Sequence, residues 1–390
     1  MFNMSTQYDY DHGIVNRNFY VMRELAKDTR IEKIVAVDFL PIGLKKTIKH
    51  YWQNILFEIK TAEMVYGDPT SACYQKTDKI FTYTTVDSFY SLNKVAKELK
   101  RVEKILNLKN IVFWSYNPLF TQFINKLNEK LFVFDTVDNW SEHESYIKLL
   151  NKRKILQNYK KIATLADIIF TVSQELQDFY KKMDRLDDVY WIPNGVDLNL
   201  FQKNDQTAKT PLDKINKPII GYLGTLQERI DIDLLEYIAV NHPDKVLALC
   251  GPVWDSVKKE IGSKLNRLDN VIFTGRVPAN EAPSYINKFD VAIIPHKIND
   301  FIKSTNPMKM YEYLACAKPI VAAPGAGIDM FKDNVYVADN MALFSGLINK
   351  ALSEDSEVKR QSRLKAVETH SWQNRVEQMT DIVFEKLKVK

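Results

Sequence analysis

Lys309 and Glu312 lie three residues apart in a run, Ser304 to Ala315, whose residue types could bind a diphosphate. Asn306 is a favourable N-cap and Pro307 suits the first helical position, so the run predicts a helix that begins there. The N–H groups of a helix N-terminus bind phosphate, and a lysine in the first turn adds a full positive charge. Glu312 would share the face of Lys309 and could accept both hydroxyls of a ribose. The alternative is an ordinary capped helix with an ion pair on its surface.

The next segment, Lys318 to Gly325, predicts a buried strand that ends in a glycine turn. The helix before it would therefore stand at the carboxyl edge of a parallel sheet. Open parallel sheets bind their ligands at this edge, which favours the phosphate-binding interpretation of Lys309.

Two stretches of the chain alternate short apolar runs with amphipathic segments, the pattern of a parallel sheet covered by helices. The expected strands are residues 34–38, 111–114, 131–134, 168–172, 189–192, 219–223, 246–250, 271–274, 291–294 and 320–323. The expected helices are residues 18–27, 91–106, 142–166, 174–183, 233–241, 255–265, 283–288, 307–315 and 372–388.

A polar segment, Asp197 to Lys217, separates the two stretches and is the expected linker. We therefore predict an α/β chain with two Rossmann-like, doubly wound domains, residues 1–200 and 217–370. A final helix in residues 371–390 would pack back toward the first domain.

The composition excludes several classes of protein. With 390 residues, 45% hydrophobic and 26% charged, the chain is neither collagenous, disordered nor a disulfide scaffold. Cys73, Cys250 and Cys316 are too far apart to predict a zinc site or a disulfide framework. The net charge of +5 is too small to indicate nucleic acid. Without a secretory signal or an apolar run of about 18 residues, we expect a cytoplasmic protein.

Residues 44–57 mix lysines with aromatic and aliphatic side chains at helical spacing. Such a helix suits the anionic inner face of a membrane, which would make the protein peripheral. The equal alternative is a helix that packs its aromatic side chains inward and solvates its lysines.

Five motifs resemble, in order and spacing, those of GT-B fold glycosyltransferases. The donor-site motif is Asn306-Pro-x-Lys-x-x-Glu-Tyr-Leu-Ala, followed by Lys318-Pro-Ile-Val. The others are residues 166–173, 192–197, 221–225, and 271–277 with 289–295. The resemblance covers Asp135 to the C-terminus strongly and the first 130 residues weakly. It implies a GT-B fold, with two Rossmann-like domains that face an inter-domain cleft.

The resemblance implies a nucleotide-sugar site in the C-terminal half. Gly224 would let the backbone approach the diphosphate, Arg229 and Lys309 would bind it, and Glu312 would bind the ribose. The other implied donor contacts are Arg276 and Val277 beside the base, and Thr305, Asn306 and Met308.

One position departs from the pattern of the large retaining family 4. A second glutamate of that family stands where this chain has Ser304. The Met308-Lys309 pair is more similar to the membrane-associated glucuronosyltransferase of xanthan synthesis, an inverting enzyme. The resemblance therefore favours inversion.

An inverting transfer needs a base that takes a proton from the acceptor hydroxyl. A predicted strand ends near Asp135, and Asp138 follows in a loop that would face the cleft. We favour Asp138 as the base and Asp135 as its support; the alternative is one capping and one solvated aspartate. His12, beside Gly13, is a rival base or an acceptor contact.

Two further features have competing interpretations. His296 ends a predicted strand at the donor edge and could contact the donor sugar, or it could be a core or capping histidine. Asp231-Ile-Asp233 spells D-x-D, a metal signature of another fold, but residues i and i+2 of a helix point apart. We interpret Asp231 as an N-cap and expect no metal or other cofactor.

The implied function is transfer of a sugar from a nucleotide diphosphate sugar, expected to be a UDP-sugar, to a saccharide or polyprenyl-linked acceptor. The setting would be cell-surface polysaccharide synthesis. Two alternatives share the fold: a nucleotide-sugar 2-epimerase and a catalytically silent binding partner. The epimerase needs several acid and base groups around the sugar, and no histidine cluster is evident among the six histidines.

Overall fold

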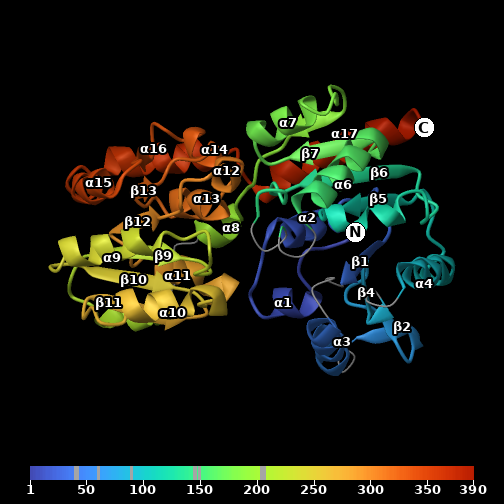
Figure 1. Ribbon diagram of the computed structural model, residues 1–390, viewed down its shortest axis with the longest axis horizontal. Helices are drawn as coiled ribbons and strands as arrows, with labels where there is room; N and C mark the ends of the chain where they lie inside the picture. The colour runs from blue at the N-terminus through green and yellow to red at the C-terminus, as the bar shows by residue number, and fades with distance from the viewer. Residues whose placement is uncertain (39–43, 59–61, 88–90, 144–146, 148–150, 203–207) are drawn as a thin grey trace. The chain divides into compact units, whose positions relative to one another are not determined.

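The computed structural model describes residues 1–390 except 39–43, 59–61, 88–90, 144–146, 148–150 and 203–207 (Figure 1). Contacts divide the chain into unit 1, which comprises Met1–Ile192 and Val376–Lys390, and unit 2, Pro193–Arg375. The expected linker therefore falls within unit 2. It carries α8 (Leu198–Phe201) and η3 (Pro211–Lys214), whose residues Phe201 and Leu212 are buried in the core of that unit.

The described strands of unit 1 form two four-stranded sheets, in the orders β1-β4-β3-β2 and β5-β6-β7-β8. Their bounds are β1 Ile34–Asp38, β2 Glu63–Asp68, β3 Ser71–Gln75, β4 Ile80–Thr85, β5 Val112–Ser115, β6 Leu131–Thr136, β7 Ile168–Thr171 and β8 Val189–Trp191. Strands β5 to β8 pair in parallel. Strand β4 pairs with β1 in parallel but with β3 in antiparallel fashion, as β3 does with β2.

The sequence patterns predict no strand in the region of β2, β3 and β4. Strand β2 is exposed or half-buried along its length, so it has no buried apolar run to reveal it. Asp68 closes the turn into β3, because its Oδ1 accepts hydrogen bonds from the Thr70 and Ser71 N–H groups at 2.8 and 2.9 Å.

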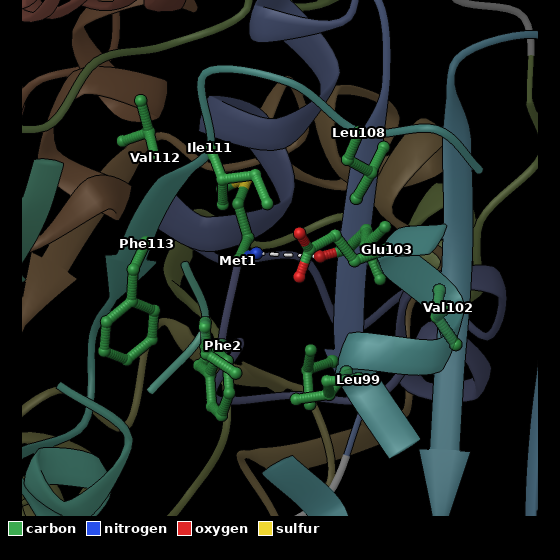
Figure 2. A pocket seen from close by; sticks show the side chains of 12 residues that line it. Met1, Phe2, Leu99, Val102, Glu103, Leu108, Ile111, Val112 and Phe113 are labelled. Carbon is green, nitrogen blue, oxygen red and sulfur yellow. Dashed lines mark hydrogen bonds between the residues drawn. The ribbon is translucent and has the colours of Figure 1, made fainter. Parts of the chain in front are cut away.

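Residues Met1 to Asn3 join the two sheets of unit 1. Phe2 forms parallel bridges with Val37 of β1 and Ser115 of β5. Its N–H donates to the Trp114 carbonyl at 2.8 Å. Figure 2 shows Phe2 and Phe113 beside a mostly apolar hollow. Leu99 and Val102, from the helix after β4, line the same hollow. The rings of Phe2 and Phe113 are 4.9 Å apart between centroids.

The described helices of unit 1 are α1 Gln7–Asp11, α2 Arg17–Leu25, α3 Leu44–Glu58, α4 Leu92–Ile105, η2 Pro118–Phe123, α6 Lys152–Leu165 and α7 Gln174–Lys181. Helix α17 (Trp372–Lys388) begins in unit 2 and continues into unit 1. The helix predicted over 142–166 is interrupted at Asn151, and residues 144–146 and 148–150 of that prediction lie outside the described residues. Asn151 is the N-cap of α6, with a left-handed φ of 55° and a side chain that accepts from the Lys154 N–H.

Unit 2 contains one parallel sheet of six described strands, in the order β11-β10-β9-β12-β13-β14. Their bounds are β9 Ile219–Leu223, β10 Val246–Cys250, β11 Val271–Gly275, β12 Val291–Ile294, β13 Ile320–Ala322 and β14 Tyr336–Val337. The first strand of unit 2, β9, lies between β10 and β12, so the strand order reverses there. Doubly wound sheets bind ligands outside the carboxyl ends of the strands at such a switch point.

Helices between these strands are α9 Ile232–Asn241, α10 Asp255–Lys264, η4 Ala279–Glu281, α11 Ala282–Ile286, α12 Asp300–Lys303, α13 Met308–Ala315 and α14 Ala326–Asp329 (Figure 1). Helices α15 Met341–Ser353 and α16 Glu357–Val367 follow β14. The interpretation of Asp231 as an N-cap is confirmed, because its Oδ1 accepts from the Leu234 N–H at 2.9 Å. Asp233 instead forms an ion pair with Lys264.

Candidate active site

The switch point of unit 2 brings together residues from three places in the sequence. Gly224 follows β9, His296 follows β12, and Lys309 lies in the first turn of α13. A fourth residue, Arg229, is on the loop after β9. That loop is held to the end of β12, since the Lys297 N–H donates to the Arg229 carbonyl at 2.9 Å.

Gly224 allows a close approach of three chain segments. Its φ is 146°, and a Cβ there would lie 3.1 Å from the Tyr222 hydroxyl and 3.2 Å from Lys309 Cε. On the other side, a Cβ on Gly251 would lie 2.0 Å from the Gly224 carbonyl oxygen. Only residues without a Cβ fit this crossing, and the Lys309 side chain therefore lies against backbone.

Lys309 and Arg229 concentrate positive charge at this point. Burial and the charge of Arg229 lower the pKa of Lys309, while Glu312 acts in the opposite direction. The Lys309 ammonium also lies 5.3 Å from the centre of the Tyr222 ring. Within the described part of the chain, neither cation has a carboxylate at ion-pairing distance. An anion such as a diphosphate would supply the missing negative charge.

Glu312 is the partly buried carboxylate of the cluster. Burial raises its pKa, and the nearby charge of Lys309 lowers it. A carboxylate held in a low-dielectric place can accept hydrogen bonds from sugar hydroxyls. Its position one helical turn after Lys309 agrees with the spacing argument.

His296 is 3% exposed, and its Nε2 has no hydrogen-bond partner among the residues that the structure describes. Burial, Lys309 and Arg229 lower its pKa well below the ordinary value, so its imidazole is neutral. A neutral imidazole can donate to or accept from a hydroxyl group. This unsatisfied nitrogen suits a substrate contact better than a capping role.

The prediction that Asn306 is the N-cap of the helix that carries Lys309 is wrong. Pro307 is the N-cap of α13 and makes no side-chain cap bond, and Met308 is the first helical residue. Asn306 is engaged elsewhere: its Oδ1 accepts from the Asn194 N–H at 3.1 Å. A side chain used for that contact cannot cap its own helix.

The remaining residues predicted to bind the donor follow strands at the same edge of the sheet, but they differ in burial and contacts. The buried Thr305 hydroxyl donates to the Ile302 carbonyl at 2.9 Å, within its own turn. Met308 is partly buried. Arg276 is exposed and Val277 packs on the core; both follow β11, two strands along the sheet from β9. Their contact with a base stays a prediction.

In unit 1, the structure places Asp135 in a buried ion pair with Arg17. The proposed support of Asp138 by Asp135 stays a prediction. Asp138 is partly buried in the loop after β6, where its carbonyl accepts from the Tyr159 hydroxyl at 3.0 Å. His12 is exposed and stacks on Tyr8, with its Nδ1 2.8 Å from the Tyr8 carbonyl.

Gly13 follows His12 with a φ of 82°, a left-handed conformation that favours glycine. It closes the turn after α1, where its N–H donates to the Tyr10 carbonyl at 3.1 Å. Its predicted place in an acceptor loop stays a prediction.

Sequence reasoning missed Tyr222, Arg17 and Asn194. Tyr222 is on β9, two residues before Gly224, and the alternation of a strand predicts that both lie on one side. This spacing could have identified Tyr222. Arg17 offered none, because its partner Asp135 is 118 residues away. Asn194 belongs to the motif at residues 192–197, for which the resemblance implied no role in the site.

Comparison with known proteins shows the kind of enzyme. Residues 217–353 match the model of the family "Glycosyl transferases group 1". TuaH of Bacillus subtilis (strain 168), provisionally named a teichuronic acid biosynthesis glycosyltransferase, is 26% identical over 307 residues, 74% of this chain and 75% of TuaH. The chain is a GT-B glycosyltransferase.

Solved structures agree with this GT-B assignment. Sucrose-phosphate synthase from Thermosynechococcus elongatus has a TM-score of 0.73 at 15% identity, covering 99% of this chain and 98% of that one. HepE of Anabaena in complex with UDP and glucose has a TM-score of 0.71 at 14% identity, covering 98% of each chain. At such identities the likeness shows the fold alone. The α/β, GT-B fold predicted from the sequence is confirmed.

In this GT-B glycosyltransferase, helix α3 presents an exposed apolar stripe. Ile48, Trp52 and Leu56 are 38%, 52% and 54% exposed at four-residue spacing. Tyr51 and Asn54 face inward, and the Asn54 amide donates to the Thr84 hydroxyl at 3.1 Å. The side chains of residues 44–47, 50 and 57 lie outside the described residues. No described helix is long and apolar enough to cross a membrane.

Proposed function

We propose that the chain transfers a sugar from a UDP-sugar to a saccharide or polyprenyl-linked acceptor in cell-surface polysaccharide synthesis. The donor site is supported by one observation at the switch point of unit 2: Lys309 lies against Gly224, and the charge of Arg229 is close enough to lower the pKa of Lys309. The HepE complexes with UDP support UDP as the nucleotide. The name of TuaH supports the polysaccharide setting.

The reaction we propose is an inverting displacement. The Asp138 carboxylate takes the proton of the acceptor hydroxyl as its oxygen attacks the anomeric carbon of the donor. The bond from that carbon to the diphosphate oxygen breaks, and its electron pair leaves with the UDP. Ser304, where retaining relatives are expected to have glutamate, supports inversion: it is buried and its hydroxyl donates to the Phe301 carbonyl at 2.9 Å.

Positive charge at the donor site would stabilise the departing diphosphate. Arg229, Lys309 and the N-terminus of α13 supply that charge from the protein, and such preorganised charge stabilises a developing anion. We therefore expect transfer to continue when divalent cations are chelated. Transfer that stops in chelator and returns with added Mg²⁺ would contradict this part of the proposal.

The apolar stripe of α3 is the proposed contact with an anionic membrane. Trp52 and Leu56 would enter the interface, while Lys49, which is exposed on the same helix, would face lipid headgroups. The protein should float with vesicles that contain phosphatidylglycerol, and the Trp52→Ala/Leu56→Ala variant should not. Trp254→Ala removes another half-exposed tryptophan, in unit 2, and is the matched control.

Incubation with a panel of UDP-sugars and polyprenyl-linked or free saccharide acceptors tests the main proposal. Transfer from one donor, with the anomeric configuration of the product followed by NMR, would support it. Asp138→Asn should abolish transfer while leaving UDP affinity unchanged. Sugar-nucleotide turnover without an acceptor would contradict the proposal and favour an epimerase, and UDP-sugar binding without turnover would favour a silent partner.

A further inference from the structure

The chain crosses from unit 1 to unit 2 at residues 192 and 193, and the segment that follows is firmly held within unit 2. Val196 and Ser371 form a bridge, in which the Val196 N–H donates to the His370 carbonyl at 3.0 Å. A Cβ on Gly195 would lie 2.8 Å from that same carbonyl, so the two segments touch at the backbone. The second crossing, at residues 375 and 376, follows directly in α17.

Asn194 connects this crossing segment to the residue before the donor helix. Its N–H donates to Asn306 Oδ1 at 3.1 Å, and its Nδ2 donates to the Asn306 carbonyl at 2.6 Å. The two side chains are 7% and 5% exposed. Two hydrogen bonds between one pair of residues fix both the position and the orientation of the Asn306 peptide.

The far side of Asn306 is equally restricted. A Cβ on Gly327 would lie 2.9 Å from the Asn306 Cα, so a second segment backs it closely. Helix α13 starts two residues later, and Pro307 gives it no side-chain cap. The direction in which α13 leaves is therefore determined by how Asn306 is held rather than by a local cap.

We propose that Asn194 is a positioning residue for the donor site. It acts through Asn306 on the first turn of α13, which carries Lys309 against Gly224. A buried polar pair could serve the stability of unit 2 alone. What favours a role in binding is its place: the bonded peptide immediately precedes the turn whose N–H groups and lysine would hold the diphosphate. The inference rests on the proposed donor site.

Asn270 provides a matched control in the same unit. Its amide donates to three backbone carbonyls, those of Ala239, His242 and Lys245, at 2.9 to 3.3 Å. It immediately precedes β11, at the amino edge of the sheet, whereas the donor site is at the carboxyl edge. Loss of either amide should lower the melting temperature, but only loss of the Asn194 amide should change nucleotide binding.

The test measures UDP affinity by calorimetry and donor KM and kcat in the full chain. Asn194→Ala should weaken UDP affinity about tenfold and raise the donor KM, with kcat much less affected. Asn194→Asp keeps the side-chain volume and the backbone bond but loses the Nδ2 donor, and should act in the same direction. In a Lys309→Met background, Asn194→Ala should have little further effect on UDP affinity.

Two results would overturn the inference, and they are distinguishable. If Asn194→Ala and Asn194→Asp melt earlier but bind UDP as tightly as the unsubstituted protein, Asn194 is purely structural. If Asn270→Ala weakens UDP binding as much as Asn194→Ala, general loosening of unit 2 explains the effect. Failure of the unsubstituted protein to bind UDP or any UDP-sugar would instead overturn the proposed donor site, and this inference with it.

Discussion

Arg17 Nε donates to both carboxylate oxygens of Asp135, at 3.0 and 2.9 Å, and the two side chains are 3% and 0% exposed. The pair joins the first turn of α2 to the end of β6. Burial raises the pKa of Asp135, and the Arg17 guanidinium partly offsets this. Removal of one partner from such a pair leaves a buried charge uncompensated.

Asp135→Asn should therefore destabilise the protein strongly. The expected loss is about 3–5 kcal/mol in the free energy of unfolding, because Arg17 keeps its charge in a buried site. Urea denaturation measures it. Asp138→Asn, at a partly buried loop position, should unfold close to the unsubstituted protein while losing transfer. Equal stability of the two variants would show that Arg17 finds another partner.

Lys309→Met should weaken UDP binding by about tenfold or more, because it removes a charge-assisted contact to the diphosphate. Calorimetric titration measures the effect. The variant should melt no lower than the unsubstituted protein without ligand, since desolvation already disfavours the charged lysine, as its lowered pKa indicates. Lys303→Met is the control: Lys303 is 62% exposed and pairs with Asp300. Equal UDP affinity in both variants would show that Lys309 does not contact the diphosphate.

Gly251→Ala should destabilise unit 2 by about 3 kcal/mol or more, because its φ is 154° and its new Cβ would meet the Gly224 carbonyl oxygen at 2.0 Å. Gly262 lies within α10, and a Cβ added there would have no neighbouring atom within 4 Å. Gly262→Ala should therefore stabilise the protein by about 0.5–1 kcal/mol. Thermal melts of both variants measure these changes in stability. A Gly251→Ala variant as stable as the unsubstituted protein would mean that the loops after β9 and β10 separate easily.

Glu98→Gln should stabilise the protein at neutral pH. Glu98 is 2% exposed, accepts from the Tyr83 hydroxyl and lies with Asp68 and Asp87 in one cluster. Burial and then these two carboxylates raise its pKa. A carboxyl whose pKa is higher folded than unfolded binds more protons in the native state, so its contribution to stability falls as pH rises between the two pKa values.

The difference between Glu98→Gln and the unsubstituted protein should therefore disappear toward pH 4, where both side chains are neutral. Denaturation at several pH values measures this trend. A variant that is less stable at every pH would indicate that the ion pair with Lys94, 3.6 Å from Glu98 Oε1, outweighs the cost of the charge.

Several elements of the fold follow directly from local patterns. Strands β9, β10 and β12 have the predicted bounds, because continuous apolar runs are required where both faces of a parallel sheet are covered. Helix α17 also has the predicted bounds, since its apolar residues repeat at helical spacing. The pattern around Lys309 and Glu312 likewise predicted that both lie in one helix, which is α13.

Local patterns were enough to predict the α/β class and strands β9 to β13 of unit 2, because an apolar run or a helical period lies within about ten residues. They missed the two-residue strand β14, and the GT-B motifs were identified by resemblance rather than by periodicity. Which polar groups meet depends instead on the packing of the whole unit. Asn306 bonds to Asn194 across 112 residues, and Asp135 pairs with Arg17 across 118. Phe2 bridges the two sheets of unit 1, at strands β1 and β5, which come later in the chain. Such contacts depend on how segments far apart in the sequence pack together, so no local sequence pattern identifies the two residues that will meet.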